Sequence, residues 1–283
     1  MTTVASTKTP APRRTRIRIA PGLVVAVVFA ALFAIAAVVP QILATTAPTA
    51  QDFTAALRPP SFEHWFGTDE SGRDLYSRVV HGTRESLLIG IGAAGIALVA
   101  ALVLGSLAAL GDRFTSAIVN RGIEVVFAFP ILLLALLLVS ILGASAWTQV
   151  IAVGVSTAPG YARMVRGQIL AAKNAGYVEA ARALGHGRGR ILTRHVLPNA
   201  VRPLVAVFTM AIGQSIVWAS GLAFLGLGVA PPSSEWGALL DAGRAYILQA
   251  PWLTFVPGLV ILVLALTATS LGKHIQNSLE KGE

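Results

Sequence analysis

Residues 174–199, NAGYVEAARALGHGRGRILTRHVLPN, carry the side chains with the clearest capacity for specific chemistry in this chain. Glu179 precedes Ala180 and Ala181, so one carboxylate stands beside two side chains that are small enough to enter a narrow cleft. Such a carboxylate can accept a charge-assisted hydrogen bond from a basic group of another protein, or it can cap its own loop. The chemistry is that of a docking segment, because no nucleophile, base and acid come together along the sequence.

The pattern of this segment predicts two short helices joined by a glycine turn. The first has an apolar stripe at positions i, i+3, i+4 and i+7, formed by Tyr177, Ala180, Ala181 and Leu184. Gly185 and Gly187 are expected to end it, because glycine adopts the left-handed backbone conformation that other residues resist. The second helix is expected over residues 188–196, with Pro198 marking its end.

The elements that must position this segment are expected to cross a membrane. Of the 283 residues, 55% are hydrophobic and only 12% are charged, and the mean hydropathy is +0.71. Charged side chains are absent from five long runs, namely residues 19–51, 86–111, 125–162, 203–234 and 245–272. A crossing takes about 20 helical residues, so the run 125–162 holds two crossings with a turn near Gly143. We therefore expect an all-α membrane protein with six transmembrane helices, near residues 21–43, 86–110, 122–142, 146–166, 203–228 and 252–272.

The placement of basic residues predicts the orientation. With six crossings and the N-terminus inside, 17 of the 22 lysine and arginine residues lie on the cytoplasmic side, together with residues 174–199. This asymmetry follows the positive-inside rule, so both termini are expected to be cytoplasmic. The net charge of +9 is then explained by membrane topology, because most of the basic residues lie in the segments expected on the cytoplasmic side. Because the charges are spread over loops between spans, nucleic-acid binding is not favoured.

The chain is expected to have five parts, two of which carry further candidate sites. The parts are a cytoplasmic basic tail (1–20), a first transmembrane helix (21–43), an external loop with an interfacial helix (44–85), a five-helix core that includes the cytoplasmic loop 174–199 (86–273), and a cytoplasmic tail (274–283). Charged residues of the external loop either brace an amphipathic helix through intrahelical ion pairs or form a contact surface for an external partner; they are Asp69, Arg73, Asp74, Arg78 and Arg84. In the fifth span, Gln214, Ser215 and Trp218 face either neighbouring helices or a solute pathway.

Several classes of function are disfavoured by what the sequence lacks. No charged residue lies in the middle of a span, whereas a proton-driven carrier needs an ionisable relay there. No GxxxxGK[ST] motif is present, so ATP and its magnesium ion would have to be bound by other subunits. There is no cysteine, and the five histidines are scattered, so we expect neither a metal site nor a cofactor. The chain is expected to be a non-catalytic conduit that receives its energy from elsewhere.

Three stretches resemble one family of transporters. The first resembles the EAA motif of ABC importer membrane subunits, carried here by Glu179, Ala180, Ala181, Gly185, Leu197 and Pro198. His195, two residues before Leu197, looks like the variant of the peptide and nickel branch. GTDESGRDLYSRVVHGTRESL, before the second span, and FLGLGVAPPSSEWGALLDAGR, at 224–244, are similar to dipeptide and oligopeptide permeases of the OppC/DppC type.

The resemblance implies the type I ABC importer permease fold and a set of partners. In that family the EAA loop docks in a cleft of an ATP-binding subunit, a role that would fall to the motif residues together with Leu184 and His195. The implied partners are a second homologous permease, two ATP-binding subunits and an extracytoplasmic solute-binding protein, in the cytoplasmic membrane of a prokaryote. The implied cargo is di- or oligopeptides, and nickel chelates or glutathione-like solutes are alternatives. A proton-coupled carrier and a scaffolding membrane protein are the rivals from other classes.

Overall fold

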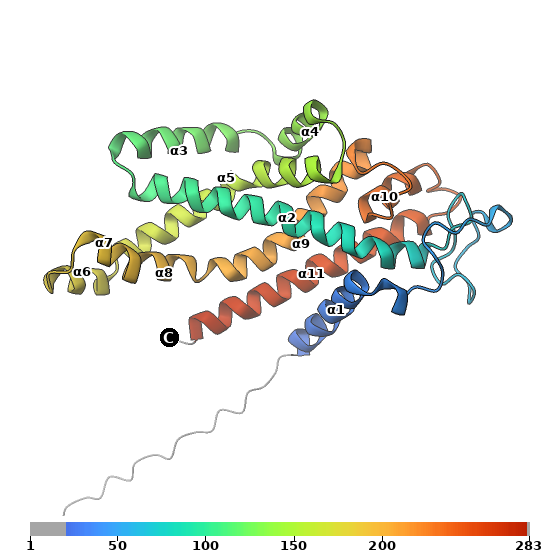
Figure 1. Ribbon diagram of the computed structural model, residues 1–283, viewed down its shortest axis with the longest axis horizontal. Coiled ribbons are helices and arrows are strands. Elements are labelled where there is room, and N and C mark those ends of the chain that lie inside the picture. Colours follow the sequence, from blue (N-terminus) through green and yellow to red (C-terminus); the bar gives the residue numbers. More distant parts are fainter. Residues whose placement is uncertain (1–20, 282–283) are drawn as a thin grey trace, which may run out of the picture.

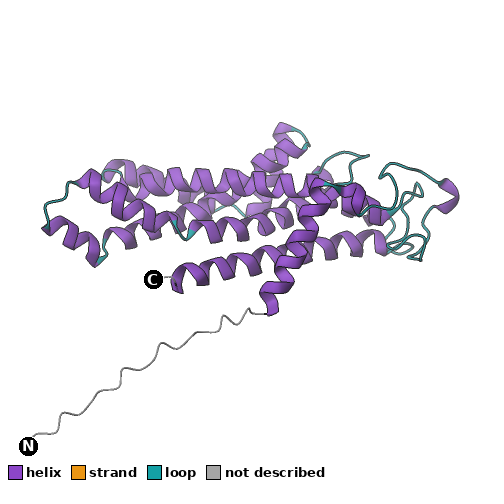
Figure 2. Ribbon diagram, turned by 60° about the horizontal axis from the view of Figure 1, so that its bottom comes forward, coloured by secondary structure: helices purple, strands orange, loops and turns teal. Residues whose placement is uncertain are grey.

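A computed structural model of the chain describes residues 21–281, which form helices and loops and no strand (Figure 2). Four long helices make the bundle, namely α2 (Leu75–Leu110), α5 (Ala146–Lys173), α9 (Leu204–Leu222) and α11 (Trp252–Lys281) (Figure 1). α2 packs against α5 and α9, and α9 packs against α11. The predicted all-α membrane architecture is confirmed.

Two elements lie at the outside of this bundle. α1 (Pro21–Val38) contacts α11 and α2 along one edge. On another side, α3 (Arg113–Phe127) lies against α2 and α5, and α4 (Ile131–Leu142) lies against α5 and α9; α3 and α4 are bent by 89° relative to each other. The transmembrane helix expected over residues 122–142 is therefore broken, because Pro130 between them cannot donate a backbone hydrogen bond.

The short elements gather at the two ends of the long axis (Figure 1). One end holds α6 (Gly176–Ala183), α7 (Arg188–Ile191), the π-helical turn η3 (Leu192–Val196) and α8 (Leu197–Val201). The other end holds the loop after α1 with η1 (Pro40–Ile42) and η2 (Phe53–Ala55), the π-helical turn η4 (Ala223–Leu227) that extends α9, and α10 (Trp236–Arg244). The bundle thus connects two structurally different ends.

Small residues allow α2 and α5 to pack closely, as the glycines of the second span predict. A Cβ atom on Gly105 of α2 would lie 2.8 Å from the carbonyl oxygen of Ala162, and one on Gly154 of α5 would lie 2.8 Å from Cβ of Ile96. Four alanines of α2, Ala93, Ala94, Ala97 and Ala101, are fully buried. The two helices therefore behave as one rigid unit.

Within the described residues, length and apolar character support four crossings, or five if a bent pair of helices counts as one span. Four stretches qualify alone, at residues 21–38, 75–110, 188–227 and 252–280, and the bent pair α3–α4 adds the fifth. α5 is long enough to cross but carries several polar residues. The count of six spans and the cytoplasmic side of both termini therefore stay predictions.

Two boundaries differ from those expected from the sequence. Residues 75–85, expected to form a separate interfacial helix, are the first turns of α2. The Asp74 carboxylate accepts a hydrogen bond from the backbone N–H of Ser77 and caps the helix there, and no proline interrupts the turns that follow. Residues 274–281, expected to be a tail, continue α11. The basic tail predicted for residues 1–20 lies outside the described residues.

Candidate functional site

α6 ends in the glycine turn that the sequence predicts. Gly185 has a left-handed φ of +77°, and its N–H donates to the carbonyl oxygen of Arg182 at 2.9 Å. The N–H of His186 donates to the carbonyl oxygen of Ala181 at 3.1 Å. These two bonds are the Schellman arrangement, which satisfies the last carbonyls of a helix. Gly187, also expected to end α6, has an ordinary φ of −66° and precedes α7 as its N-cap.

α6 has a buried face and an exposed face. Val178 and Ala181 are buried in a core cluster with Ile169 of α5 and Val196 of η3. The exposed face is formed by Tyr177, Glu179, Ala180 and Leu184. The apolar stripe predicted from the sequence therefore does not face the core as a unit: of its four members only Ala181 does.

Nothing within the described residues covers the exposed face of α6. The side chain of Leu184 is 77% exposed. Glu179 forms no ion pair or side-chain hydrogen bond with any residue of 21–281. The exposed face of α6 therefore combines a protruding leucine, a small alanine side chain and a carboxylate that is unpaired within the described residues.

The second half of the segment is helical over residues 188–201, further than predicted. Pro198 does not end this helix but lies in the first turn of α8. The π-helical turn before it lets the N–H of Leu197 donate to the carbonyl oxygen of Leu192, five residues back. This wider turn makes room for a proline, which has no N–H and whose ring would clash in a regular turn.

Two further contacts connect the segment to its surroundings. The ring of His195 stacks on that of His186, with 6.1 Å between ring centroids. The end of α11 also reaches the segment. It lines a cleft of about 650 Å³ with residues of α5, α6 and α8, including Tyr177, Asn199, Gln276, Leu279 and Glu280.

The polar residues predicted in the fifth span lie in different settings on α9. Gln214 is exposed, and its Oε1 accepts a hydrogen bond from the hydroxyl of Tyr161 on α5 at 3.0 Å. Ser215 is buried. Trp218 is partly exposed, but its Nε1 is buried and has no hydrogen-bond partner among the described residues.

Gln149 of α5 was missed by the sequence reasoning. Its side chain is fully buried, with Nε2 3.5 Å from the carbonyl oxygen of Ala219 on α9 and with Oε1 unpaired among the described residues. Ser220, next on α9, also has a buried hydroxyl without a partner in that part of the chain. The signal was a single amide in an apolar run. The interface between α5 and α9 thus keeps hydrogen-bonding capacity that these residues do not use.

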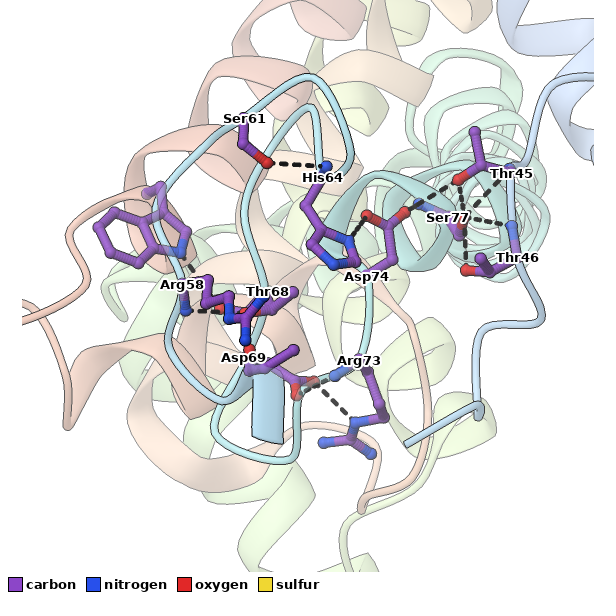
Figure 3. Close-up of polar contacts among 12 residues, drawn as sticks. Thr45, Thr46, Arg58, Ser61, His64, Thr68, Asp69, Arg73, Asp74 and Ser77 are labelled. Atoms are coloured by element: carbon purple, nitrogen blue, oxygen red, sulfur yellow. Dashed lines mark hydrogen bonds and ion pairs between the residues drawn. The ribbon is translucent and has the colours of Figure 1, made fainter. Parts of the chain in front are cut away.

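At the opposite end, the charged motif is a buried network centred on Asp69 (Figure 3). Asp69 Oδ2 accepts from Arg73 Nε at 2.7 Å and from Arg78 Nη1 at 2.6 Å. Asp69 Oδ1 accepts from the backbone N–H groups of Ser71 and Arg73, each at 2.9 Å. Arg73 also pairs with Glu70 at 2.9 Å. One buried carboxylate therefore holds two buried guanidinium groups.

Asp74 connects the loop after α1 to the start of α2 (Figure 3). Its Oδ2 accepts from the backbone N–H of Ser77 at 2.8 Å and from the hydroxyl of Thr45 at 3.3 Å. Its Oδ1 lies 3.1 Å from Nδ1 of His64. The carboxylate is at once the cap of α2 and the anchor of a loop that is distant in sequence.

The network extends to the loop before α10. Arg78 Nη2 donates to the carbonyl oxygen of Ser233 at 2.9 Å. Glu235 is buried, and it accepts from the Ser86 hydroxyl at 3.1 Å and from the backbone N–H of Ala238 at 2.9 Å. Burial raises the pKa of Glu235 above its ordinary value, because desolvation disfavours the charged form. Three segments distant in sequence are thus held together here.

This arrangement corrects the prediction for the external motif. The ion pairs connect loop residues to each other and to α2, and they are not pairs within one helix. Arg84 is exposed and forms no ion pair within residues 21–281. In the same part of the chain, no three histidine or acidic side chains converge as metal ligands would.

Comparison with known proteins matches this architecture. Residues 101–281 fit the profile of the family described as "Binding-protein-dependent transport system inner membrane component". The dipeptide permease DppC of Alkalihalophilus pseudofirmus is 37% identical over 79% of this chain and 74% of its own length. The di/tripeptide permease DppC of Pseudomonas aeruginosa is 38% identical over 90% and 84%. The glutathione permease GsiD of Pectobacterium atrosepticum is 39% identical over 81% and 76%.

Solved structures share the fold. An amino acid ABC transporter aligns with a TM-score of 0.59 at 16% identity, over 71% of this chain and 94% of that one. An inward-facing MetNI methionine ABC transporter aligns with a TM-score of 0.59 at 19% identity, over 71% and 96%. The chain belongs to the family of binding-protein-dependent transport system inner membrane components, the permease subunits of ABC importers.

Proposed function

We propose that this permease imports dipeptides and related short peptides, and that separate ATP-binding subunits drive it through residues 174–199. The names of the relatives support this cargo, because two of them are permeases for dipeptides or for di- and tripeptides. Glutathione is itself a short peptide, so the glutathione permease is compatible with the same class of solute. Nickel chelates are an alternative with the same architecture.

The observation that carries the proposal is the uncovered face of α6. Tyr177, Ala180 and Leu184 expose apolar surface beside the carboxylate of Glu179. In the proposed complex this face enters a cleft of the ATP-binding subunit. Ala180 keeps the helix narrow there, and Glu179 accepts a charge-assisted hydrogen bond from a basic group of the partner. The turn at Gly185 fixes the angle at which the second half of the segment leaves α6.

The buried face of α6 gives a route for the motion. Val178 and Ala181 share one core cluster with Ile169 of α5 and Val196 of η3. Through η3 and α8 the chain continues into α9. A force on α6 therefore reaches α5 and α9 together, and a packed core transmits it as a rigid-body displacement rather than absorbing it.

The solute pathway in this proposal runs beside the α5–α9 interface. Gln214, Ser215 and Trp218 would contribute to it from α9, and Tyr161 and Gln149 from α5. The unpaired Oε1 of Gln149 and Nε1 of Trp218 supply one acceptor and one donor, which are the groups that a peptide backbone needs. Displacement of α5 and α9 together, relative to the second permease, would open the pathway beside these groups.

The proposed partners are those of a complete importer. They are a second homologous permease, two ATP-binding subunits that bind ATP and magnesium, and an extracytoplasmic solute-binding protein. This chain itself would bind no cofactor and carry out no catalysis, and it would reside in the cytoplasmic membrane of a prokaryote. The solute-binding protein would do most of the selection among peptides.

Transport by the purified complex tests the proposal. The chain is reconstituted with its partner subunits in lipid vesicles, and uptake of a radiolabelled dipeptide is measured with ATP and the solute-binding protein. Uptake should require both of these and should not respond to a pH gradient. Uptake by the chain alone, driven by a pH gradient, would instead establish a proton-coupled carrier. A complex that assembles but moves no peptide, nickel chelate or glutathione would leave a scaffolding role.

A further inference from the structure

A second cavity lies behind the exposed face of α6, where the ends of α2 and α5 meet α7 and η3. Its volume is about 650 Å³. Half of its lining is basic, contributed by Lys173, Arg182, His186 and Arg188, and half is apolar, contributed by Leu110, Ile191, Leu192 and Val196. The described residues of the lining include no acidic side chain, so they give the cavity the charge of an anion site.

The basic groups around this cavity are not neutralised by the protein. Lys173, Arg182 and Arg188 form no ion pair within residues 21–281. Nδ1 of His186 is buried and has no hydrogen-bond partner in that part of the chain. With a proton on this nitrogen, the ring can donate a hydrogen bond to an oxygen of a bound anion. Like charges gathered without a counter-charge repel one another, and a bound anion would relieve that repulsion.

An apolar stripe leads away from the cavity along α2. Val99, Val103 and Leu107 are 63%, 54% and 43% exposed. They follow one another at i, i+4 and i+8, and Leu110 of the cavity lies on the same side of the helix. α2 is long and apolar enough to span the membrane, and Leu110 is its last residue. The cavity thus lies at the end of an exposed apolar surface of a helix that can span the membrane.

We propose that this cavity binds the phosphate headgroup of an anionic phospholipid. Arg182, Arg188 and Lys173 hold the phosphate, and an acyl chain lies along the stripe of Val99, Val103 and Leu107. A free phosphate would use only the basic half of the lining, and so would an acidic segment of another protein. Only an amphiphile with an anionic head uses both the basic and the apolar half. Basic cavities beside membrane helices are suited to such headgroups.

Lipid retention provides the test. The full-length chain, alone and in complex with its partner subunits, is purified from nanodiscs of phosphatidylcholine and phosphatidylglycerol in equal amounts, and bound lipids are counted by native mass spectrometry. One phosphatidylglycerol should remain bound to the wild type. The double variant Arg182→Gln/Arg188→Gln should bind it about 30-fold more weakly, since each basic residue near an anionic headgroup contributes roughly a fivefold factor.

A matched control has the same charge change outside the cavity. Arg190→Gln/Arg194→Gln removes two exposed arginines of the same segment that do not line the cavity, and it should retain the lipid as the wild type does. Chromatographic profiles and melting temperatures in phosphatidylcholine alone verify that both double variants fold. Equal lipid loss from the two variants would overturn the site.

Two further outcomes would replace the lipid by another ligand. If inorganic phosphate added to the wild type displaces the bound lipid, the anion comes from solution and the lipid assignment is overturned. If the isolated chain retains the lipid but the assembled complex expels it, an acidic partner segment occupies the cavity instead. Because the readout is lipid binding and not transport, these results are independent of the proposed cargo and of ATP coupling.

Discussion

The two ends of the molecule use charge in opposite ways. At the end that holds the loop after α1, Asp69, Arg73 and Arg78 are buried and pair with one another. At the other end, Glu179 and Arg182 of α6 are exposed and form no ion pair within the described residues. The buried charges are paired with one another, which holds them in one geometry, whereas exposed unpaired charges are available to other molecules. The buried ion pairs of Asp69, Arg73 and Arg78 form what we call the clamp at one end, and the exposed face of α6 at the other end is the proposed surface for partners.

The largest expected effect breaks the clamp. Asp69→Asn removes the carboxylate charge that holds the guanidinium groups of Arg73 and Arg78, both less than 10% exposed. Leaving buried cations without their counter-charge should lower the free energy of unfolding by about 3–5 kcal/mol. The melting temperature of the purified chain in detergent, followed by tryptophan fluorescence, measures it.

An exposed ion pair provides the control for this variant. Arg121 and Glu124 of α3 lie 3.3 Å apart, with side chains 80% and 63% exposed. Glu124→Gln should cost at most about 1 kcal/mol, because water and salt screen the pair. If Asp69→Asn melted at the same temperature as Glu124→Gln, the clamp would not hold the outer end together.

The next effect concerns the partner surface and leaves the clamp intact. Gly185→Val places a β-branched residue at φ +77°, where it costs roughly 1–3 kcal/mol of local strain. Among the described residues, no atom other than those of its chain neighbours lies within 4 Å of a Cβ atom added at Gly185, so the strain falls on the turn alone. The protein should stay in the membrane while peptide uptake per ATP hydrolysed falls at least about tenfold, since misplacing α6 by even a small angle removes it from its partner.

Gly187→Val, at an ordinary φ of −66° and also in open space, is the matched control. Wild-type coupling in Gly185→Val would contradict the proposed role of residues 174–199.

The sequence predicted the position of this surface better than its orientation. Gly185 marked the turn, because the backbone preference of glycine is a local property of the chain. The cytoplasmic side of the loop, which the charge asymmetry predicts, stays a prediction. The apolar stripe was assigned a single face, yet of its members Ala181 is buried and Leu184 is exposed. Periodicity identifies which residues share a side of a helix, but it does not say which side the rest of the fold covers.

Contacts between distant segments were the harder part of the prediction. Asp69 was expected either to pair within one helix or to face an external partner, and it instead connects a loop to α2. Pro198 was expected to stop a helix, and a π-helical turn accommodates it. Gln149 could not be identified from the sequence, since a single amide in an apolar run matches no motif. Its role is visible only because α9 packs beside it. Each case depends on tertiary structure that local sequence does not contain.

A pair of truncations sharpens the distinction between the two faces of α6. Val178 is fully buried and Leu184 is 77% exposed, although both lie on the same short helix. Val178→Ala should lower the free energy of unfolding by about 2 kcal/mol, because it removes two buried methyl groups and leaves a cavity. Leu184→Ala should leave the melting temperature of the isolated chain unchanged and weaken binding of the ATP-binding subunits. Melting curves and co-purification yields measure the two effects. The reverse pattern would mean that Leu184 supports the fold and that α6 presents another face.

The smallest expected effect lies at the margin of the clamp and depends on pH. Burial raises the pKa of Glu235, so the folded chain retains this proton at pH values where an unfolded glutamate, with a pKa of about 4.3, has lost it. The contribution to stability is therefore full below the unfolded pKa, decreases as the pH rises toward the folded pKa, and is constant above it.

Glu235→Gln removes this titration while keeping the shape of the side chain, so its melting temperature should decline less between pH 4 and neutrality than that of the wild type. The effect is limited because the Ser86 hydroxyl and the backbone N–H of Ala238 also stabilise the ionised carboxylate. Glu124→Gln, at an exposed position, is the control and should leave the pH dependence of the melting temperature as it is in the wild type. If Glu235→Gln also showed the wild-type pH dependence, Glu235 would be ionised in the folded chain.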